Sequence, residues 1–144
     1  MKTLCTTFLL SILFTACSVK PEPLVMGKDA CYTCKMTLVD NKFGAEVVTK
    51  KGKIYKFDDL NCMLKFHHAG YESKENISSW MVALYTEPKQ LLDATHAFYS
   101  QSEQVKSPMA GNVAAFHSKE EMEKYNTEWN GKILTWKELS EQFK

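Results

Sequence analysis

Residues 54–66 read Ile-Tyr-Lys-Phe-Asp-Asp-Leu-Asn-Cys-Met-Leu-Lys-Phe, a strand pattern joined directly to the beginning of a helix. The extended run ends at Phe57, and Asp58 is expected to cap a helix that starts at Asp59. One helical face then carries mostly apolar side chains at i, i+3, i+4 and i+7, at Leu60, Met63, Leu64 and His67. The stretch predicts a strand–cap–helix unit that is too small to bury its apolar face alone.

The same unit recurs in the second half of the chain. Residues 113–117 form another extended run before a helix, and a shift of 59 residues superposes Phe57 on Phe116, Met63 on Met122 and Lys65 on Lys124. Further strand patterns occupy residues 43–49, 80–85, 96–100 and 132–134. We therefore expect an α+β fold in which two small ββαβ-type repeats, residues 29–79 and 80–144, pack as one compact unit.

Two capping-box patterns predict the helices of the second repeat. Ser118 and Glu121 open a helix that is expected to end at about residue 125. Thr135 and Glu138 open the last helix, and the turn at residues 130–131, Asn-Gly, separates the two.

The beginning of the chain resembles the signal of a bacterial lipoprotein. An apolar run is followed by Thr15-Ala16-Cys17, and signal peptidase cuts before the cysteine in such signals. We interpret residues 1–16 as a lipoprotein signal peptide and residues 17–28 as an acylated Cys17 and a Pro-rich tether. The alternative is an ordinary cleaved signal with an incidental cysteine. We expect an exported protein, lipid-anchored to a bacterial membrane and facing the periplasm.

The charge balance argues against nucleic-acid binding, and the sequence patterns argue against catalysis. The 144 residues carry 18 Lys+Arg and 17 Asp+Glu, a formal net charge of +1, whereas a protein that binds nucleic acid needs a clear cationic excess. Hydrophobic residues make up 44% of the chain, which is enough for a folded core. No Ser/His/Asp or paired-carboxylate pattern is present, so we expect no catalytic residues and no enzymatic activity.

Sulfur is unusually frequent, with seven Met and five Cys in this short chain. Without Cys5 and the acylated Cys17, three thiols remain, and an odd number cannot all pair as disulfides. Residues 31–36 read Cys-Tyr-Thr-Cys-Lys-Met, and soft sulfur donors select Cu(I), zinc or iron–sulfur clusters. Zinc usually takes four ligands, and a neutral thioether suits Cu(I) better. The candidate Cu(I) ligands in this segment are Cys31, Cys34 and Met36.

The other candidate ligands lie apart from this segment. Met109 stands in a turn between Pro108 and Gly111 with no evident role in helix packing, so we expect it to be a further metal ligand. Cys62 is expected in the middle of a helix, and we interpret it as a buried core cysteine. Whether Cys62 nevertheless adds a ligand stays open, as do the roles of Met26, His96 and His117.

Two other hypotheses account for the same sulfur atoms. An extracytoplasmic thiol–disulfide oxidoreductase would use Cys31 and Cys34, although neither Trp80 nor Pro88 stands where a thioredoxin-like domain has its Trp and Pro. In a structural lipoprotein the sulfurs would only pack or form a crosslink, such as a disulfide between Cys31 and Cys34.

Several segments together resemble the NosL family of copper-binding lipoproteins. They are Asp29 to Met36 with its two cysteines, Phe57 to Leu64, Ala97-Phe98-Tyr99 and Ser107 to Phe116. The resemblance implies two ββαβ-type halves, Cu(I) binding without catalysis, and delivery of copper to an exported copper enzyme. The expected client is nitrous oxide reductase, helped by an ABC-type maturation transporter. Members often have Gly where this chain has Lys35.

Overall fold

The structure, a computed structural model, describes residues 19–142 of the chain. The expected signal peptide, residues 1–16, and the expected lipid attachment site, Cys17, lie outside the described residues. Among the described residues, none of the helices combines the length and the apolar character that crossing a membrane requires.

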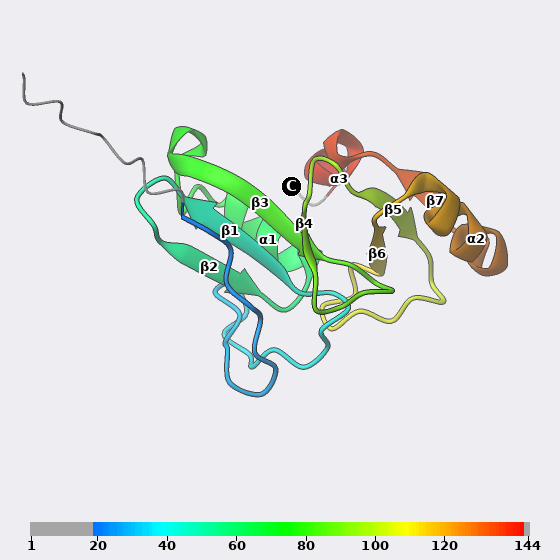
Figure 1. Cartoon of the computed structure of the whole chain (residues 1–144), viewed down its shortest axis with the longest axis horizontal. Coiled ribbons are helices and arrows are strands. Elements are labelled where there is room, and N and C mark those ends of the chain that lie inside the picture. The colour runs from blue at the N-terminus through cyan, green and yellow to red at the C-terminus, as the bar shows by residue number, and fades with distance from the viewer. Residues whose placement is uncertain (1–18, 143–144) are drawn as a thin grey trace, which may run out of the picture.

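The first repeat is an antiparallel sheet with one helix packed on it (Figure 1). β1 (Ala45–Thr49) and β2 (Ile54–Phe57) form a hairpin, α1 (Leu60–His68) follows, and β3 (Ile77–Ala83) pairs with the other edge of β1. The central strand of this ββαβ unit is therefore its first strand, and α1 packs across β1 and β2.

The second repeat has the same order of elements and the same strand arrangement. β5 (Phe98–Gln101), β6 (Val113–Phe116), α2 (Lys119–Trp129) and β7 (Lys132–Leu134) form a sheet of order β6-β5-β7, again with the first strand in the centre. The expected α+β fold with two ββαβ-type repeats is confirmed. A last helix, α3 (Trp136–Gln142), follows β7.

The boundary between the repeats differs from the expected one. The expected boundary at residues 79 and 80 falls inside β3, all of which belongs to the first sheet. The same sheet gains a fourth strand, β4 (Leu91–Asp93), which pairs with β3, and a 3-10 turn, η1 (Lys74–Asn76), precedes β3. Strand pairing thus places the boundary between the two repeats after β4. The sequence of β4 has no alternation of polar and apolar residues that would predict it.

Capping explains where α1 begins. The N-cap is Asp59 and not Asp58, because Asp59 has extended backbone angles and its side chain accepts a hydrogen bond from the Asn61 N–H at 2.8 Å. Asp58 instead accepts a hydrogen bond from the Val39 N–H at 3.0 Å. The first helical residue is therefore Leu60, which places Cys62 in the first turn of α1.

The helices of the second repeat also follow their caps. The Ser118 side chain accepts from the Glu121 N–H as the capping box predicts, but α2 runs past residue 125 to Trp129. It ends at Asn130, whose φ of 46° lies in the left-handed region that favours a helix stop. Before α3, Thr135 and Glu138 exchange hydrogen bonds in a complete capping box.

One apolar core joins the two repeats. It combines Phe57 and Met63 of the first repeat with Tyr99 and Leu134 of the second, all nearly or completely buried. Leu139 of α3 belongs to the same core, and α3 also returns to α1, where His68 Nε2 donates to the Ser140 carbonyl at 2.6 Å. The two repeats therefore fold as one unit, as expected from units too small to bury their faces alone.

The N-terminal segment lies against the outer face of the first sheet. The Glu22 N–H donates to Glu46 Oε1 at 3.1 Å, and Lys56 forms ion pairs with Glu22 at 3.4 Å and with Asp29 at 2.9 Å. In the described part of the expected tether, residues 19–25 have no helix or strand and residues 26–28 form a turn, and Glu22 fastens the segment to β1 and β2. Figure 1 shows this blue segment running beside β1 toward the loops that contain the cysteines.

Candidate metal centre

Three cysteines from two parts of the first repeat meet at one point. The Sγ atoms of Cys31, Cys34 and Cys62 all lie within 4.8 Å of one another, and none of them forms a disulfide. Cys31 and Cys62 are completely buried, whereas Cys34 is partly exposed. The cluster therefore has two interior sulfur atoms and one that solvent or another molecule can reach.

A tight loop brings Cys31 and Cys34 together. An isolated bridge between Ala30 and Thr37 closes the loop, the Cys31 N–H donates to the Met36 carbonyl at 2.8 Å, and the Lys35 N–H donates to the Cys31 carbonyl at 2.9 Å. The backbone N–H of Cys34 also hydrogen-bonds to the Cys31 sulfur, and that of Met36 to the Cys34 sulfur. Backbone amides thus orient both sulfur atoms into the same space.

The turn after Cys34 requires an unusual backbone conformation. Lys35 has a φ of 65°, in the left-handed region that glycine adopts without steric cost. The Lys35 Nζ lies 4.1 Å from the centroid of the Tyr32 ring, and this cation–π contact offsets part of the strain.

Aromatic packing fastens the same loop to the sheet and the helix. The Tyr32 ring meets Tyr55 of β2 edge-on at 4.8 Å, Phe66 of α1 at 5.4 Å and Tyr71 at 5.7 Å. The Tyr32 N–H also donates to the Lys56 carbonyl on β2 at 2.8 Å. The loop is therefore held in place by its packing against the sheet and the helix.

Cys62 joins the cluster because it lies in the first turn of α1. The Thr33 hydroxyl donates to the Cys62 carbonyl at 2.8 Å, which ties the loop to that turn. The expected mid-helix position was wrong, since the helix starts at Leu60, although the cysteine is buried as expected. The odd number of thiols is the signal in the sequence that points to it.

The surroundings shift the pKa values of the three thiols in different directions. Hydrogen bonding from the Cys62 thiol, supported by the backbone N–H groups of Cys34 and Asp58, lowers the pKa of Cys31 to about 5. The same hydrogen bond raises the pKa of Cys62, and burial raises the pKa of Cys34. Burial also raises the pKa of the Asp58 carboxyl, whose Oδ2 has no hydrogen-bond partner among the described residues. Of the three thiols, Cys31 is therefore the one whose surroundings favour the thiolate.

The turn that contains Met109 is fixed to the same end of α1. Asp59 Oδ2 accepts hydrogen bonds from the Met109 N–H at 3.0 Å and from the Ser107 hydroxyl at 2.6 Å, and the Asn61 side-chain amide donates to the Met109 carbonyl at 3.1 Å. Met109 packs against the core cluster that contains Cys31 and Cys62, and Cys34 packs against the same cluster. The second repeat therefore delivers the Met109 turn to the helix turn that carries Cys62.

The other candidate ligands occupy different positions. Met36 follows the loop with its side chain 50% exposed, next to the accessible Cys34, and Met26 packs against the core. His96 is exposed and lies 3.7 Å from Asp93, and His117 is exposed. Within residues 19–142, no His, Asp or Glu joins the three cysteines as a further ligand.

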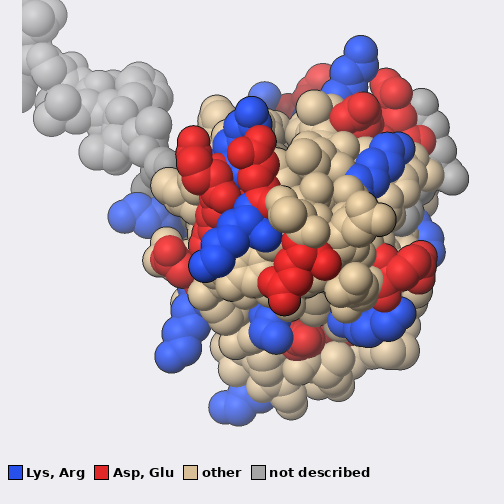
Figure 2. All heavy atoms as spheres, turned by 90° about the vertical axis from the view of Figure 1, so that its right-hand side faces the viewer, with Lys and Arg blue, Asp and Glu red and all other residues tan. Residues whose placement is uncertain are grey.

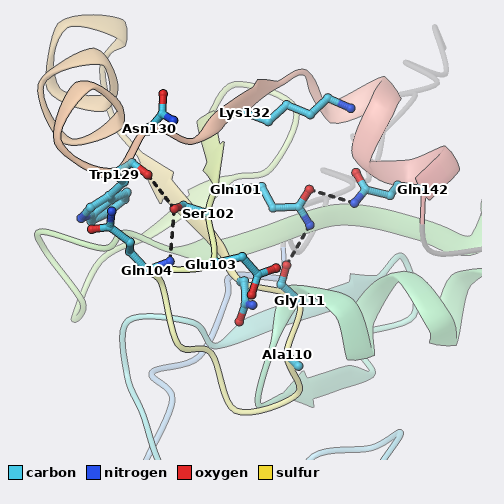
Figure 3. Close-up of a pocket in the computed structure, with 11 residues that line it drawn as sticks. Gln101, Ser102, Glu103, Gln104, Ala110, Gly111, Trp129, Asn130, Lys132 and Gln142 are labelled. Atoms are coloured by element: carbon cyan, nitrogen blue, oxygen red, sulfur yellow. Dashed lines mark hydrogen bonds between the residues drawn. The ribbon is translucent and has the colours of Figure 1, made fainter.

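A cavity beside the Met109 turn is lined in part by Ala110, Gly111 and Asn112. Its volume is about 630 Å³ and its lining is mainly polar (Figure 3). The side-chain amide of Gln142 donates to Gln101 at 2.9 Å, and that of Gln101 donates to the Gly111 carbonyl at 3.0 Å. These amides satisfy one another and hold the Gly111 side of the turn. None of the three cysteines lines this cavity.

Comparisons with known proteins agree with this arrangement. The sequence pattern of the NosL family matches residues 24–143. No curated protein matches the chain. Among solved structures, the fold is similar to the crystal structure of the copper chaperone NosL from Shewanella denitrificans, with a TM-score of 0.69 and 16% identity over 84% of this chain and 96% of that chain. The family match covers most of the chain, including the three cysteines and the Met109 turn, so this chain belongs to the NosL family.

Proposed function

We propose that this chain is a carrier of Cu(I), not an enzyme, which is exported and anchored to a membrane by a lipid at Cys17. The observation that carries the proposal is the group of three free cysteines whose Sγ atoms lie within 4.8 Å of one another. Cys31 and Cys62 are buried, and Cys34 is partly exposed. The solved structure with a similar fold is that of a copper chaperone, which supports copper as the cargo.

The donor set favours Cu(I) over zinc. Thiolate and thioether sulfur are soft ligands, which bind Cu(I) well. A structural zinc site needs four ligands, commonly Cys and His, and among the described residues only three such side chains meet. Three sulfurs complete a low-coordinate Cu(I) site, and Met109 and Met36 are the thioethers that we propose as additional ligands.

The exposure of the site suits transfer of the ion to another protein. Cys34 is partly exposed and Met36 is half exposed beside it, while Cys31 and Cys62 are buried. An incoming ligand from an acceptor protein reaches the Cys34 side first and bonds to copper before the buried thiolates release it. A site that exchanges ligands in this way transfers copper without releasing the free ion.

The geometry argues against a disulfide oxidoreductase. Catalysis of thiol–disulfide exchange needs an accessible first thiolate, normally at a helix N-terminus. Here the first cysteine of the pair, Cys31, is 0% exposed and lies in a loop, and a third thiol, Cys62, is beside it. This arrangement suits stable metal binding better than attack of a thiolate on a disulfide substrate.

We also propose the identity of the acceptor and its helper. The client is an exported copper enzyme, nitrous oxide reductase, and an ABC-type transporter assists the transfer. The family match and the lipoprotein-like sequence that ends at Cys17 support this proposal. Loss of copper from the reductase in a deletion strain, restored by the wild-type chain but not by Cys34→Ser, is the expected result.

A competition titration against a chromophoric Cu(I) chelator tests the binding site. Reduced protein that starts at Ser18 is titrated without oxygen, beside Cys34→Ser, Cys62→Ser and Met109→Leu. We expect one tightly bound Cu(I) per chain, binding that is lost in both cysteine variants, and affinity that is reduced about tenfold or more in Met109→Leu.

Lys124→Ser provides the matched control, because Lys124 is exposed on α2, away from the thiols. Its affinity is expected to equal that of the unaltered chain. Weak binding that neither cysteine substitution changes would contradict the copper proposal. Equal affinity of Met109→Leu and the unaltered chain would remove Met109 from the site and leave the three-thiol site intact.

A further inference from the structure

We propose that one end of the first sheet rests on an anionic phospholipid surface. This end, here named the lysine end, consists of the turn between β1 and β2, the turn η1 and the beginning of the described chain. Its cationic side chains are all exposed, and they are Lys20, Lys50, Lys51, Lys53 and Lys74. The proposal rests on the proposed lipid anchor at Cys17 and states how the anchored protein is oriented.

Backbone contacts bring these lysines to one place. The Lys50 N–H donates to the Asn76 carbonyl at 2.8 Å, which joins the hairpin turn to η1. Val19 lies beside the same turn, since a Cβ atom on Gly52 would meet the Val19 side chain at 3.5 Å. In Figure 1 the described chain begins, in blue, on this side of the first sheet.

The charge at this end is mostly uncompensated. Two acidic side chains, Glu72 and Glu75, lie among the five lysines, which leaves an excess of three positive charges. None of the ion pairs formed by residues 19–142 involves any of these five lysines. Unpaired surface cations near anionic lipid headgroups are each attracted to the surface, and the attractions add.

The charged side chains of the second repeat are distributed differently from those of the lysine end. Figure 2 shows the face on the α2 side of the molecule, where basic and acidic side chains are interspersed. On α2 itself, Lys119 pairs with Glu123 at 3.3 Å, and further glutamates follow along the helix. The cationic excess therefore belongs to the lysine end and is not a general property of the surface.

The lysine end is also where an anchor would enter. Cys17 precedes Val19 by two residues, a length of chain that spans about 7 Å at most. A lipid on Cys17 would bring the lysine end toward the headgroups, whose attraction for cations extends over about one Debye length, 8 to 10 Å. The anchor and the lysines would then act together on one surface, and stable attachment generally requires two such signals.

This orientation directs the metal centre away from the lipid. The loop of Cys31 and Cys34 joins β2 at Lys56, through the Tyr32 N–H, and Lys56 lies three positions along the strand from Lys53 beside the turn. At about 3.3 Å per residue, the strand places the loop roughly 10 Å farther from the lysine end. The partly exposed Cys34 is then presented to partners in the aqueous compartment.

Binding to vesicles tests the proposal. The probe is a vesicle of phosphatidylethanolamine and phosphatidylglycerol at 7:3, compared with a vesicle of phosphatidylcholine. The unlipidated chain from Ser18 keeps every described element of the fold. We expect it to float with the anionic vesicles at low salt and not with the neutral ones. The double variant K50E/K51E is expected to reduce this binding by about tenfold or more.

The matched control is K119E/K124E, which makes the same change in net charge on α2 and is expected to bind as the unaltered chain does. Equal loss in both double variants, or no binding of the unaltered chain to anionic vesicles, overturns the proposal. Thermal unfolding checks that K50E/K51E is folded, and a single variant, Lys51→Gln, provides the test if it is not. Mass spectrometry of the full chain for acyl groups on Cys17 tests the anchor separately, so either proposal can fail alone.

Discussion

The carboxylate of Asp59 holds the backbone of Met109 at a distance of 3.0 Å, although the two residues are 50 positions apart in the chain. The same side chain caps α1 through the Asn61 N–H, and Asp59 is almost completely buried. One carboxylate thus starts the helix that carries Cys62 and fixes the turn that carries Met109. The two repeats are connected at the metal centre by this side chain.

Substitution Asp59→Ala is expected to weaken both the fold and the proposed site. The variant loses the helix cap and two further hydrogen bonds to a buried carboxylate, at a cost of about 3 kcal/mol in the free energy of unfolding. Urea denaturation measures this loss. Asp40→Ala, which removes a hydrogen bond from an exposed turn, is the control and should cost no more than about 1 kcal/mol.

The same variant separates two roles of the Met109 turn. If Met109 contributes its sulfur, then Asp59→Ala also lowers the Cu(I) affinity of folded protein, because the turn is released while the cysteines remain. An unchanged affinity in a destabilised variant would mean that the turn only supports the fold.

Substitutions of Lys35 test the strained turn beside Cys34. Lys35→Ala removes the contact with the Tyr32 ring and keeps a side chain at a φ of 65°, so we expect a loss of stability. Lys35→Gly removes the same contact but also relieves the strain, and it should be more stable than Lys35→Ala by about 1 kcal/mol. The free energies of unfolding of the two variants give the comparison directly. Equal values would show that the left-handed conformation carries no strain.

Much of the fold follows from local patterns in the sequence. The strand at residues 113–116, the capping boxes at Ser118 and Thr135 and the repeated strand–cap–helix unit all appear in the structure because short-range hydrogen bonds and apolar periodicity determine them. β4 could not be predicted, because its pairing with β3 depends on tertiary contacts and its three residues show no period.

Less of the candidate site than of the fold could be predicted from the sequence. The pair Cys31 and Cys34 is visible as a short motif, but Cys62 reaches it only through the packing of α1 against β1 and β2. Long-range contacts of this kind leave no periodic signal in one sequence.

The buried Glu46 makes stability depend on pH. Burial raises the pKa of its carboxyl from 4.5 to about 7, and Oε2 has no hydrogen-bond partner among the described residues. The N–H of Glu22 and the charge of Lys56 favour ionisation, while the charges of Glu22 and Asp29 oppose it. The folded protein therefore binds this proton more tightly than the unfolded chain does, so this group reduces stability as pH rises from about 4.5 through 7.

Substitution Glu46→Gln isolates this effect. The amide resembles the protonated carboxyl, so the variant should match the unaltered chain near pH 4.5 and exceed its free energy of unfolding by roughly 3 kcal/mol at pH 8. Urea denaturation at the two pH values measures the difference. Glu120→Gln on the exposed face of α2 is the control and should change neither value. A gain in Glu46→Gln that is the same at both pH values would exclude ionisation as the cause.

Thiol reactivity distinguishes the carrier from the oxidoreductase. An alkylating reagent needs both a thiolate and access to it, and the buried Cys31 and Cys62 lack access. Cys34 is partly exposed, but burial raises its pKa, so it should react first and more slowly than a free cysteine. Peptide mapping by mass spectrometry after iodoacetamide treatment at pH 7.5 identifies the order. Unfolding in urea should expose all three thiols, and Cu(I) should protect Cys34. Modification of Cys31 ahead of Cys34 in the folded protein would show that the loop opens to present a reactive thiolate, which is the property that an oxidoreductase requires.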